Sequence, residues 1–159
     1  MRYDGIIKEI VDYGEKSKDG RWIIPVVVDW DFTITKCSSW ADGTMEVNYK
    51  ALEVIKRWIK DYNVGWILDT MRHDAILVEP LKILKDNDIE LYGIRKNPQQ
   101  DKDGNSVTKA WGVFSIDDRN VGIPVEMGDG CDRPCINWDE VDRIMSPILQ
   151  EISDKLKES

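Results

Sequence analysis

The stretch IIPVVVDWDFTIT, residues 23–35, decides the fold of this chain. Its apolar residues follow one another without alternating with polar ones, a pattern typical of a strand that is buried on both faces in the middle of a parallel sheet. Directly after this apolar run come Asp29, Asp31 and Thr33. Ligands of parallel sheets bind beyond the carboxyl ends of the strands. The two aspartates therefore stand where such a protein would carry its chemistry.

Strand-like and helix-like patterns alternate along the rest of the chain. Further buried strands are predicted in NVGWILDT (63–70), IELYGIR (89–95) and WGVFSIDD (111–118), with a short one in IPVEM (123–127). Helical periodicity marks YKALEVIKRWIKDY (49–62), HDAILVEPLKILKDND (73–88) and a terminal segment at about 138–157. Asp74 and Asn137 stand where helix N-caps are expected, and Glu140 suits the third position of the last helix.

This alternation predicts a Rossmann-like three-layer α/β/α sandwich with a central, mostly parallel sheet. Strand–helix–strand units cross over right-handedly, which places the helices on the faces of the sheet. Residues 1–20 are polar and weakly patterned, and residues 38–48 are expected to form a loop. A length of 159 residues suits a single domain, 1–159, with its motif-bearing core at about 24–125.

The formal net charge of −8 makes the surface acidic. Such a surface repels nucleic acid and anionic membranes at long range, so neither is a favoured partner. No segment approaches the roughly 18 apolar residues that a membrane helix needs. The polar start MRYDGIIKEIVDYGEK is unlike a signal peptide. We therefore expect a cytoplasmic protein.

Two short segments invite a metal-site interpretation that does not hold. The motif CDRPC (131–135) has no second cysteine pair, and the only histidine, His73, lies far away in sequence. We therefore expect Cys37, Cys131 and Cys135 to be reduced thiols, as is usual in the cytoplasm. The segment DKDGNS (101–106) has its glycine at the fourth position, whereas a calcium loop needs it at the sixth.

Parallel strands would bring an unusual set of polar residues to one edge of the sheet. The set consists of Asp29, Asp31, Thr70, Lys109, Asp117 and Asp118. Two carboxylates about 4 Å apart repel by about 4 kcal/mol at an effective dielectric constant of about 20, so four of them need a cation. Oxygen ligands without histidine or thiolate select a hard metal such as Mg²⁺, which commonly bridges to phosphate. With a lysine and a hydroxyl added, the set describes a phosphate site.

Two aspartates spaced two residues apart at a strand end can divide the labour of phosphoryl transfer. One carboxylate can attack phosphorus and form an aspartyl-phosphate. The other can give a proton to the leaving oxygen and then take one from water. The metal, the lysine and the threonine would position the phosphate and neutralise its charge.

These segments resemble the motifs of the haloacid dehalogenase-like phosphatases. DWDFT is similar to their first motif, D-x-D-x-T, and WILDT to their second, an apolar strand that ends in Thr or Ser. Lys109 fits the third motif and SIDDRN the acidic fourth. Residues 68–98 and 109–122 are similar, more narrowly, to a group of small uncharacterised members with Thr-x-Arg after the second motif. The resemblance covers about 24–125, and four motifs in order are far more specific than D-x-D-x-T alone.

The resemblance implies a role for each residue of the first three motifs. Asp29 would be the nucleophile and a metal ligand. Asp31 would be the general acid and base, and its backbone carbonyl would also bind the metal. Thr70 would hold the phosphate, and Lys109 would balance the negative charge, with Lys96 as a rival for that role.

In the fourth motif the resemblance implies that Asp117 binds Mg²⁺ and that Asp118 is a further ligand or supports it. Asp129 and Asp132, in MGDGCD, form a competing fourth motif. We favour IDD, because a longer apolar run precedes it and Lys109 stands at the expected distance.

Four other residues near the motifs are of interest. Many members of the family have Gly where Phe32 stands, so the backbone there is expected to differ. Arg72 and His73 could meet the leaving group of a substrate, or they could be solvated loop residues. Trp40 is a candidate for a substrate-facing aromatic side chain, with partial burial as the alternative.

The expected function is that of an Mg²⁺-dependent phosphatase that works through an aspartyl-phosphate, on a phosphorylated substrate that the sequence does not identify. The short intervals between the motifs predict that a large cap domain is absent. An open site suits large substrates, or small ones if a second copy covers it, so a homo-oligomer is left open. The alternatives are a receiver-like phosphoacceptor, which the order of the motifs disfavours, a non-catalytic Mg²⁺-binding module, and a haloacid dehalogenase-type hydrolase.

Overall fold

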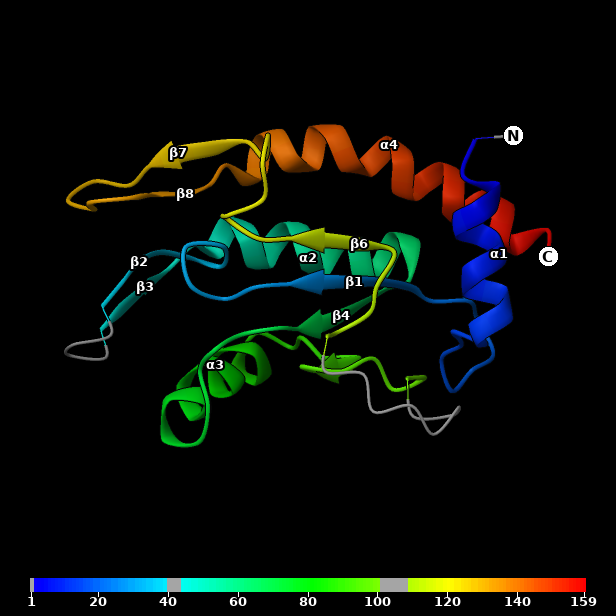
Figure 1. Ribbon diagram of the computed structural model, residues 1–159, viewed down its shortest axis with the longest axis horizontal. Coiled ribbons are helices and arrows are strands. Elements are labelled where there is room, and N and C mark those ends of the chain that lie inside the picture. Colours follow the sequence, from blue (N-terminus) through cyan, green and yellow to red (C-terminus); the bar gives the residue numbers. More distant parts are fainter. Residues whose placement is uncertain (1, 40–43, 101–108) are drawn as a thin grey trace.

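A parallel sheet forms the centre of the molecule. The computed structural model describes residues 2–39, 44–100 and 109–159 (Figure 1). Within them a four-stranded sheet has the order β5-β4-β1-β6 and parallel pairing throughout. Its strands are β1 (Ile24–Val28), β4 (Val64–Leu68), β5 (Gly93–Ile94) and β6 (Phe114–Ile116). The predicted α/β class with a central parallel sheet and no large cap is confirmed.

β1 lies in the middle of this sheet, as its uninterrupted apolar run predicts. All five residues of β1 and all five of β4 are buried. Val28, at the end of β1, is level with Leu68 of β4 and with Ile116 of β6. The chain order of the strands reverses between β1 and β6, and ligands of such sheets bind at that point.

Helices flank the sheet. α2 (Tyr49–Tyr62) packs against β4, and α4 (Trp138–Lys157) packs against α2. The side chain of Asn137 accepts a hydrogen bond of 3.2 Å from the N–H of Glu140, which confirms the predicted N-cap of α4. α3 (Ala75–Asp86) joins the main core through Leu84, which is 1% exposed. No helix in the described part of the chain is long and apolar enough to cross a membrane.

Two segments without a predicted helix or strand contain regular structure. The first twenty residues contain a helix, α1 (Asp4–Tyr13), which packs against α4 and buries Ile10 completely. The prediction of a loop at residues 38–48 is wrong, since β2 (Thr35–Ser38) and β3 (Met45–Val47) pair in antiparallel fashion. Both elements are short, and contacts with distant parts of the chain stabilise them more than their own sequence pattern does.

The predicted fifth strand exists but lies outside the parallel sheet. β7 (Val125–Met127) pairs in antiparallel fashion with β8 (Pro134–Ile136). Figure 1 shows this β7–β8 hairpin extending beyond the sheet on the same side as the β2–β3 hairpin. The two hairpins contact each other through β2 and β8.

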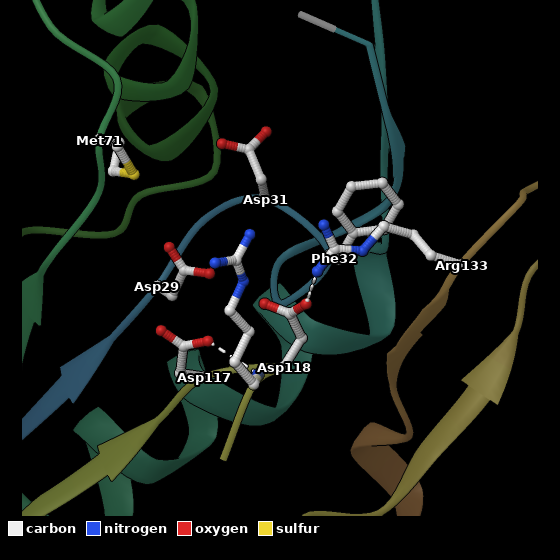
Figure 2. Close-up of a pocket in the computed structure, with 8 residues that line it drawn as sticks. Asp29, Asp31, Phe32, Met71, Asp117, Asp118 and Arg133 are labelled. Atoms are coloured by element: carbon white, nitrogen blue, oxygen red, sulfur yellow. Dashed lines mark hydrogen bonds and ion pairs between the residues drawn. The ribbon is translucent and has the colours of Figure 1, made fainter.

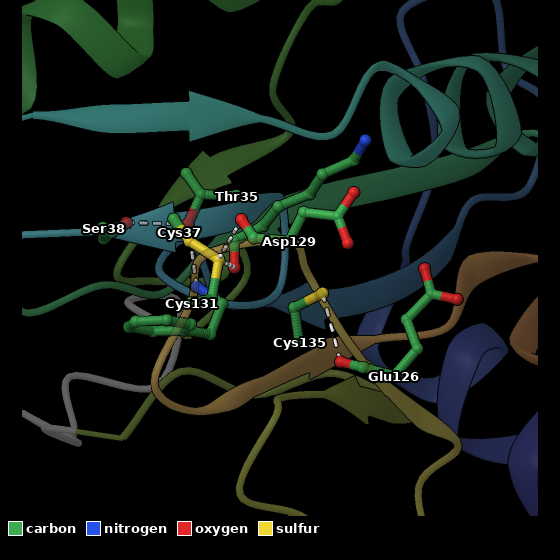
Figure 3. Close-up of a disulfide and its surroundings, with 9 residues drawn as sticks. Thr35, Cys37, Ser38, Glu126, Asp129, Cys131 and Cys135 are labelled. Atoms are coloured by element: carbon green, nitrogen blue, oxygen red, sulfur yellow. Dashed lines mark hydrogen bonds between the residues drawn. A yellow bond between two sulfur atoms is a disulfide. The ribbon is translucent and has the colours of Figure 1, made fainter.

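A disulfide joins these hairpins, which corrects the expectation of three reduced thiols. Cys37 in β2 is bonded to Cys131, in the turn of the β7–β8 hairpin, and their Cα atoms are 5.8 Å apart (Figure 3). This separation falls within the usual range for disulfides. Cys135 is a free, buried thiol that donates to the carbonyl of Glu126 at 3.5 Å.

We expect Cys131→Ser to lower the free energy of unfolding by about 2–4 kcal/mol, because a cross-link between distant residues restricts the unfolded chain. The two cysteines are 94 residues apart. Urea denaturation of the oxidised protein measures the effect, and Cys135→Ser is the matched control. If a reductant leaves the denaturation midpoint of the native protein unchanged, the disulfide is absent in solution.

Candidate functional site

Three aspartates lie side by side directly after the ends of neighbouring strands. Because Val28, Leu68 and Ile116 are level in the sheet, the residues that follow them, Asp29, Asp69 and Asp117, are level as well. The ladder continues past the strands: the N–H of Asp29 donates to the carbonyl of Ile116 at 3.0 Å, and the N–H of Asp69 donates to that of Val28 at 3.1 Å. The strand pairing therefore sets the positions of these carboxylates.

Asp29, Asp117 and Asp118 form a cluster that could hold a metal ion. One carboxylate oxygen from each lies within 4.8 Å of the others. Figure 2 shows the three side chains turned toward a common space, with Asp31 apart from them on the same loop as Asp29. Three hard oxygen donors suit a divalent cation such as Mg²⁺. The predicted grouping of Asp29 with Asp117 and Asp118 thus has a geometric basis.

The charges of this cluster are poorly neutralised by the protein alone. The pKa of Asp29 is raised from 3.8 to about 7. Burial is the largest cause, the charges of Asp117 and, to a smaller extent, Asp118 add to it, and hydrogen bonds from Trp30 and Thr33 oppose the rise. Burial also raises the pKa of Asp118, although Arg133 opposes this. A cation would relieve both effects, since mutual repulsion of carboxylates favours their protonated forms.

Thr33 joins the first acidic segment to the last. Its hydroxyl donates to Asp29 at 3.2 Å and accepts from the backbone N–H of Asp118 at 3.1 Å. Its own carbonyl accepts from the indole of Trp138 at 2.7 Å. The threonine is fully buried. It therefore holds the loop after β1 against the loop after β6.

Phe32 adopts the backbone conformation that favours glycine. Its φ is +57°, in the left-handed region that residues other than glycine rarely adopt. The Phe32 N–H donates to the hydroxyl of Thr35 at 2.9 Å, and the side chain is 5% exposed. Arg133 lies over the ring, with its Cζ 4.2 Å from the centroid. These contacts offset the backbone strain.

Asp31 is held by Arg72 instead of by the cluster. The Nε of Arg72 donates to both carboxylate oxygens of Asp31, at 3.1 and 3.0 Å, and Nη2 donates at 2.8 Å. The side chains of Arg72 and Asp31 are only 4% and 12% exposed. Arg72 is therefore not a solvated loop residue. His73, by contrast, is exposed and contacts Asp74 at 3.1 Å.

A small cavity opens beside these carboxylates. Its volume is about 140 Å³. Its lining consists of Asp29, Asp31, Phe32, Met71, Asp117, Asp118, Arg119 and Arg133 (Figure 2). The two arginines were not predicted to take part. Arg119 and Arg133 belong to segments that are distant in sequence from Asp29, and only the folded chain brings them to the cavity.

Thr70 and Lys109 do not line this cavity. Thr70 is buried, and its hydroxyl accepts from the N–H of Arg72 at 3.1 Å, so it shapes the loop that carries Arg72. Lys109 is exposed and lies near Asp69. Burial and the charge of Asp117 raise the pKa of Asp69, whereas Arg95 and Lys109 lower it. Sequence reasoning missed Asp69, although it ends its strand as Asp29 and Asp117 do.

The remaining sequence candidates lie elsewhere or outside the described residues. Asp132 lines a different cavity, beside the disulfide, and Asp129 lines neither cavity and is absent from the acidic cluster. Trp40 and the DKDGNS segment lie outside the residues that the structure describes.

Without a metal, we expect the protein to lose stability as the pH rises from about 4 to about 7. Asp29 has a pKa of about 7 in the folded protein and 3.8 as its ordinary value. The folded state therefore binds more protons in this window, and its advantage disappears as they leave. Asp118 and Asp69 are shifted in the same direction. Urea denaturation in a chelator at about pH 5 and about pH 8 measures the effect.

Two controls accompany this measurement. Asp29→Asn should reduce the pH dependence, and added Mg²⁺ should restore stability at the higher pH if the ionised cluster holds this ion. Asp19 and Asp142 have lowered pKa values and do not titrate in this window. A native protein that is more stable in chelator at pH 8 than at pH 5 would contradict the account of the cluster.

Comparison with known proteins supports the fold alone. No family model matches the chain, and no curated protein matches it significantly. Among solved structures, the fold is similar to that of a conserved protein coded by a locus of Bacteroides thetaiotaomicron, with a TM-score of 0.60 and 21% sequence identity. The likeness covers 78% of this chain and 90% of that one. The protein is thus a small α/β protein with a parallel sheet and an acidic cluster that could hold a metal ion.

Proposed function

We propose that this protein is a divalent-metal-dependent phosphomonoesterase of the haloacid dehalogenase-like type, in which Asp29 carries the phosphoryl group. The observation that carries the proposal is the separation of two kinds of carboxylate within one cavity. Asp29 belongs to the cluster that could bind a metal, whereas Asp31 lines the same cavity but is held outside the cluster by Arg72. A nucleophile beside a cation and a proton donor kept off it are what phosphoryl transfer needs.

In the first step an oxygen of Asp29 would attack phosphorus, and the bond to the leaving oxygen would break as Asp31 gives it a proton. In the second step Asp31 would take a proton from water, whose oxygen attacks phosphorus and releases Asp29 and inorganic phosphate. When bound by Asp29, Asp117 and Asp118, a divalent ion supplies charge neutralisation for the phosphoryl oxygens. Thr33 holds Asp29 in place through its hydroxyl.

The source of the further positive charge differs from the sequence expectation. Lys109 does not line the cavity, whereas Arg119 and Arg133 do. We therefore assign the balance of the transferred phosphate's charge to Arg119, with Lys109 acting on Asp69. Thr70 supports the loop of Arg72 in the unliganded protein.

A panel of phosphate monoesters, including p-nitrophenyl phosphate, tests the proposal. Protein stripped with a chelator should release no phosphate, and added Mg²⁺ should restore the release. Replacing Mg²⁺ with Ca²⁺ should support binding but little turnover, because Ca²⁺ accepts looser geometry. Equal phosphate release with and without chelator, or none with any ester and any divalent ion, would contradict the proposal and favour a non-catalytic module.

A further inference from the structure

The β7–β8 hairpin carries Arg133 into the cavity. Arg133 stands immediately before β8, two residues after Cys131, which the disulfide fixes to β2 (Figure 3). Its guanidinium lies over the Phe32 ring and pairs with Asp118, whose side chain is 5% exposed. Figure 2 shows it approaching Asp118 from the side of the hairpin. The arginine is therefore held in one orientation before any ligand binds.

This guanidinium retains unused hydrogen-bond donors. Only Nη2 donates to Asp118, and no other acceptor among the described residues bonds to Arg133. An arginine has five N–H donors in a fixed fork, so most of them remain open to a ligand. The side chain is 37% exposed, so a ligand can reach it from solvent. Arg119 lines the same cavity, and within the described chain its side chain has no hydrogen-bond or ion-pair partner.

The size of the cavity determines which part of a substrate these arginines can meet. Its 140 Å³ is small beside the roughly 300 Å³ or more of a site that encloses a whole small molecule. A phosphoryl group and an ion would occupy it, and the rest of the substrate would extend past its rim. Met71, which is 83% exposed, and Arg133 both belong to that rim.

We propose that Arg133 binds a second anionic group of the substrate, so that the site prefers phosphate monoesters that also carry a carboxylate or a second phosphate. The inference rests on the proposed function, since it names the substrate class of that site. A planar guanidinium binds either anion with two parallel hydrogen bonds. The Arg133 side chain stacks on Phe32, and the disulfide fixes the hairpin that carries it. Both restraints reduce the conformational entropy that Arg133 loses when it binds an anion.

A simpler role for Arg133 is to balance the charge of Asp118 and nothing more. The two roles differ in one measurable respect. A charge-balancing arginine would affect every phosphate ligand alike, through Asp118 and the metal. An arginine that binds a second anion would affect only those ligands that carry one.

Calorimetric binding of three non-hydrolysable ligands to the native protein in saturating Mg²⁺ separates these roles. The ligands are propylphosphonate, 3-phosphonopropionate, which adds a carboxylate, and 1,3-propylenediphosphonate, which adds a second phosphonate. We expect the two doubly functional ligands to bind about tenfold to a hundredfold more tightly than propylphosphonate, as charge-assisted hydrogen bonds allow. Comparing 3-phosphonopropionate with 1,3-propylenediphosphonate shows whether a carboxylate or a second phosphonate is preferred.

Arg133→Met should remove most of this preference and change the affinity for propylphosphonate much less. The ratio of affinities is the readout, because any effect on the metal site is common to all three ligands. Arg133→Lys should keep part of the preference, since it keeps the charge and loses the fork. Arg143→Met is the matched control, because Arg143 pairs with Glu140 on the surface of α4.

Equal binding of all three ligands by the native protein, or an unchanged preference in Arg133→Met, would overturn the inference. Failure of the proposed function gives a different result, because binding of phosphonates requires no turnover. If the protein hydrolyses esters but lacks this preference, the proposed function stands and the inference about Arg133 is wrong. If the protein shows the preference but hydrolyses no ester, the proposed function is wrong and Arg133 still binds a second anion.

Discussion

Asp29→Asn is expected to reduce the turnover of p-nitrophenyl phosphate by roughly 10³-fold or more, because the amide cannot attack phosphorus. The substitution is nearly isosteric, so the hydrogen bond from Thr33 can persist. It also removes one oxygen from the acidic cluster, which should weaken Mg²⁺ binding measured by calorimetry. Steady-state kinetics at saturating Mg²⁺ separates the loss of the nucleophile from the loss of metal.

The same substitution should stabilise the metal-free protein above about pH 7. Burial and two neighbouring carboxylates oppose the charge of Asp29, and the amide removes that charge. Loss of activity with a gain in stability is the signature of a residue kept for function and not for folding. Asp129→Asn, in the rival acidic motif, should change neither property. Full activity in Asp29→Asn would rule out a phosphoryl-enzyme at this residue.

Arg72→Met should lower the free energy of unfolding by about 1–3 kcal/mol, because it leaves the nearly buried oxygens of Asp31 without their hydrogen bonds. Arg72 makes three hydrogen bonds to Asp31, and both side chains are almost inaccessible. We also expect turnover to fall by about 10²-fold, since a general acid must keep its orientation. Thermal and urea denaturation, with kinetics below the unfolding temperature, measure both effects.

A double-mutant cycle with Asp31→Asn tests whether Arg72 acts through Asp31. If it does, the activity lost in the double variant should be close to the loss in Asp31→Asn alone. Arg72→Lys keeps the charge and provides a folded protein if Arg72→Met is too unstable. Additive losses in the double variant would show that Arg72 has a separate role.

Residues that follow directly from local pattern were predictable. The apolar run of β1 identified a central strand, and the acids after β1 and β6 meet because those strands are neighbours in the sheet. The capping of α4 by Asn137 also depends only on residues close in sequence. In each case the physical cause acts within one element or between two strongly apolar strands.

Residues whose position depends on distant short segments were not predictable. Arg133 reaches the cavity because β7 pairs with β8 and Cys131 is bonded to Cys37. No periodic pattern in the sequence predicts the strand pairing or the disulfide. In the sequence Arg72 cannot be told from any other polar loop residue, because only the folded chain brings it to Asp31. Lys109 had the right spacing, yet it lies near Asp69 and not at the cavity.

In the proposed reaction Asp29 receives a phosphoryl group beside a divalent ion held by the acidic cluster. A crystal structure of the protein soaked with Mg²⁺ and beryllium fluoride tests it most directly, because this fluoride mimics a phosphoryl group on a carboxylate. We predict beryllium bonded to an oxygen of Asp29 and a magnesium ion among Asp29, Asp117 and Asp118. Beryllium on any other residue, or magnesium density away from these three carboxylates, would contradict the account.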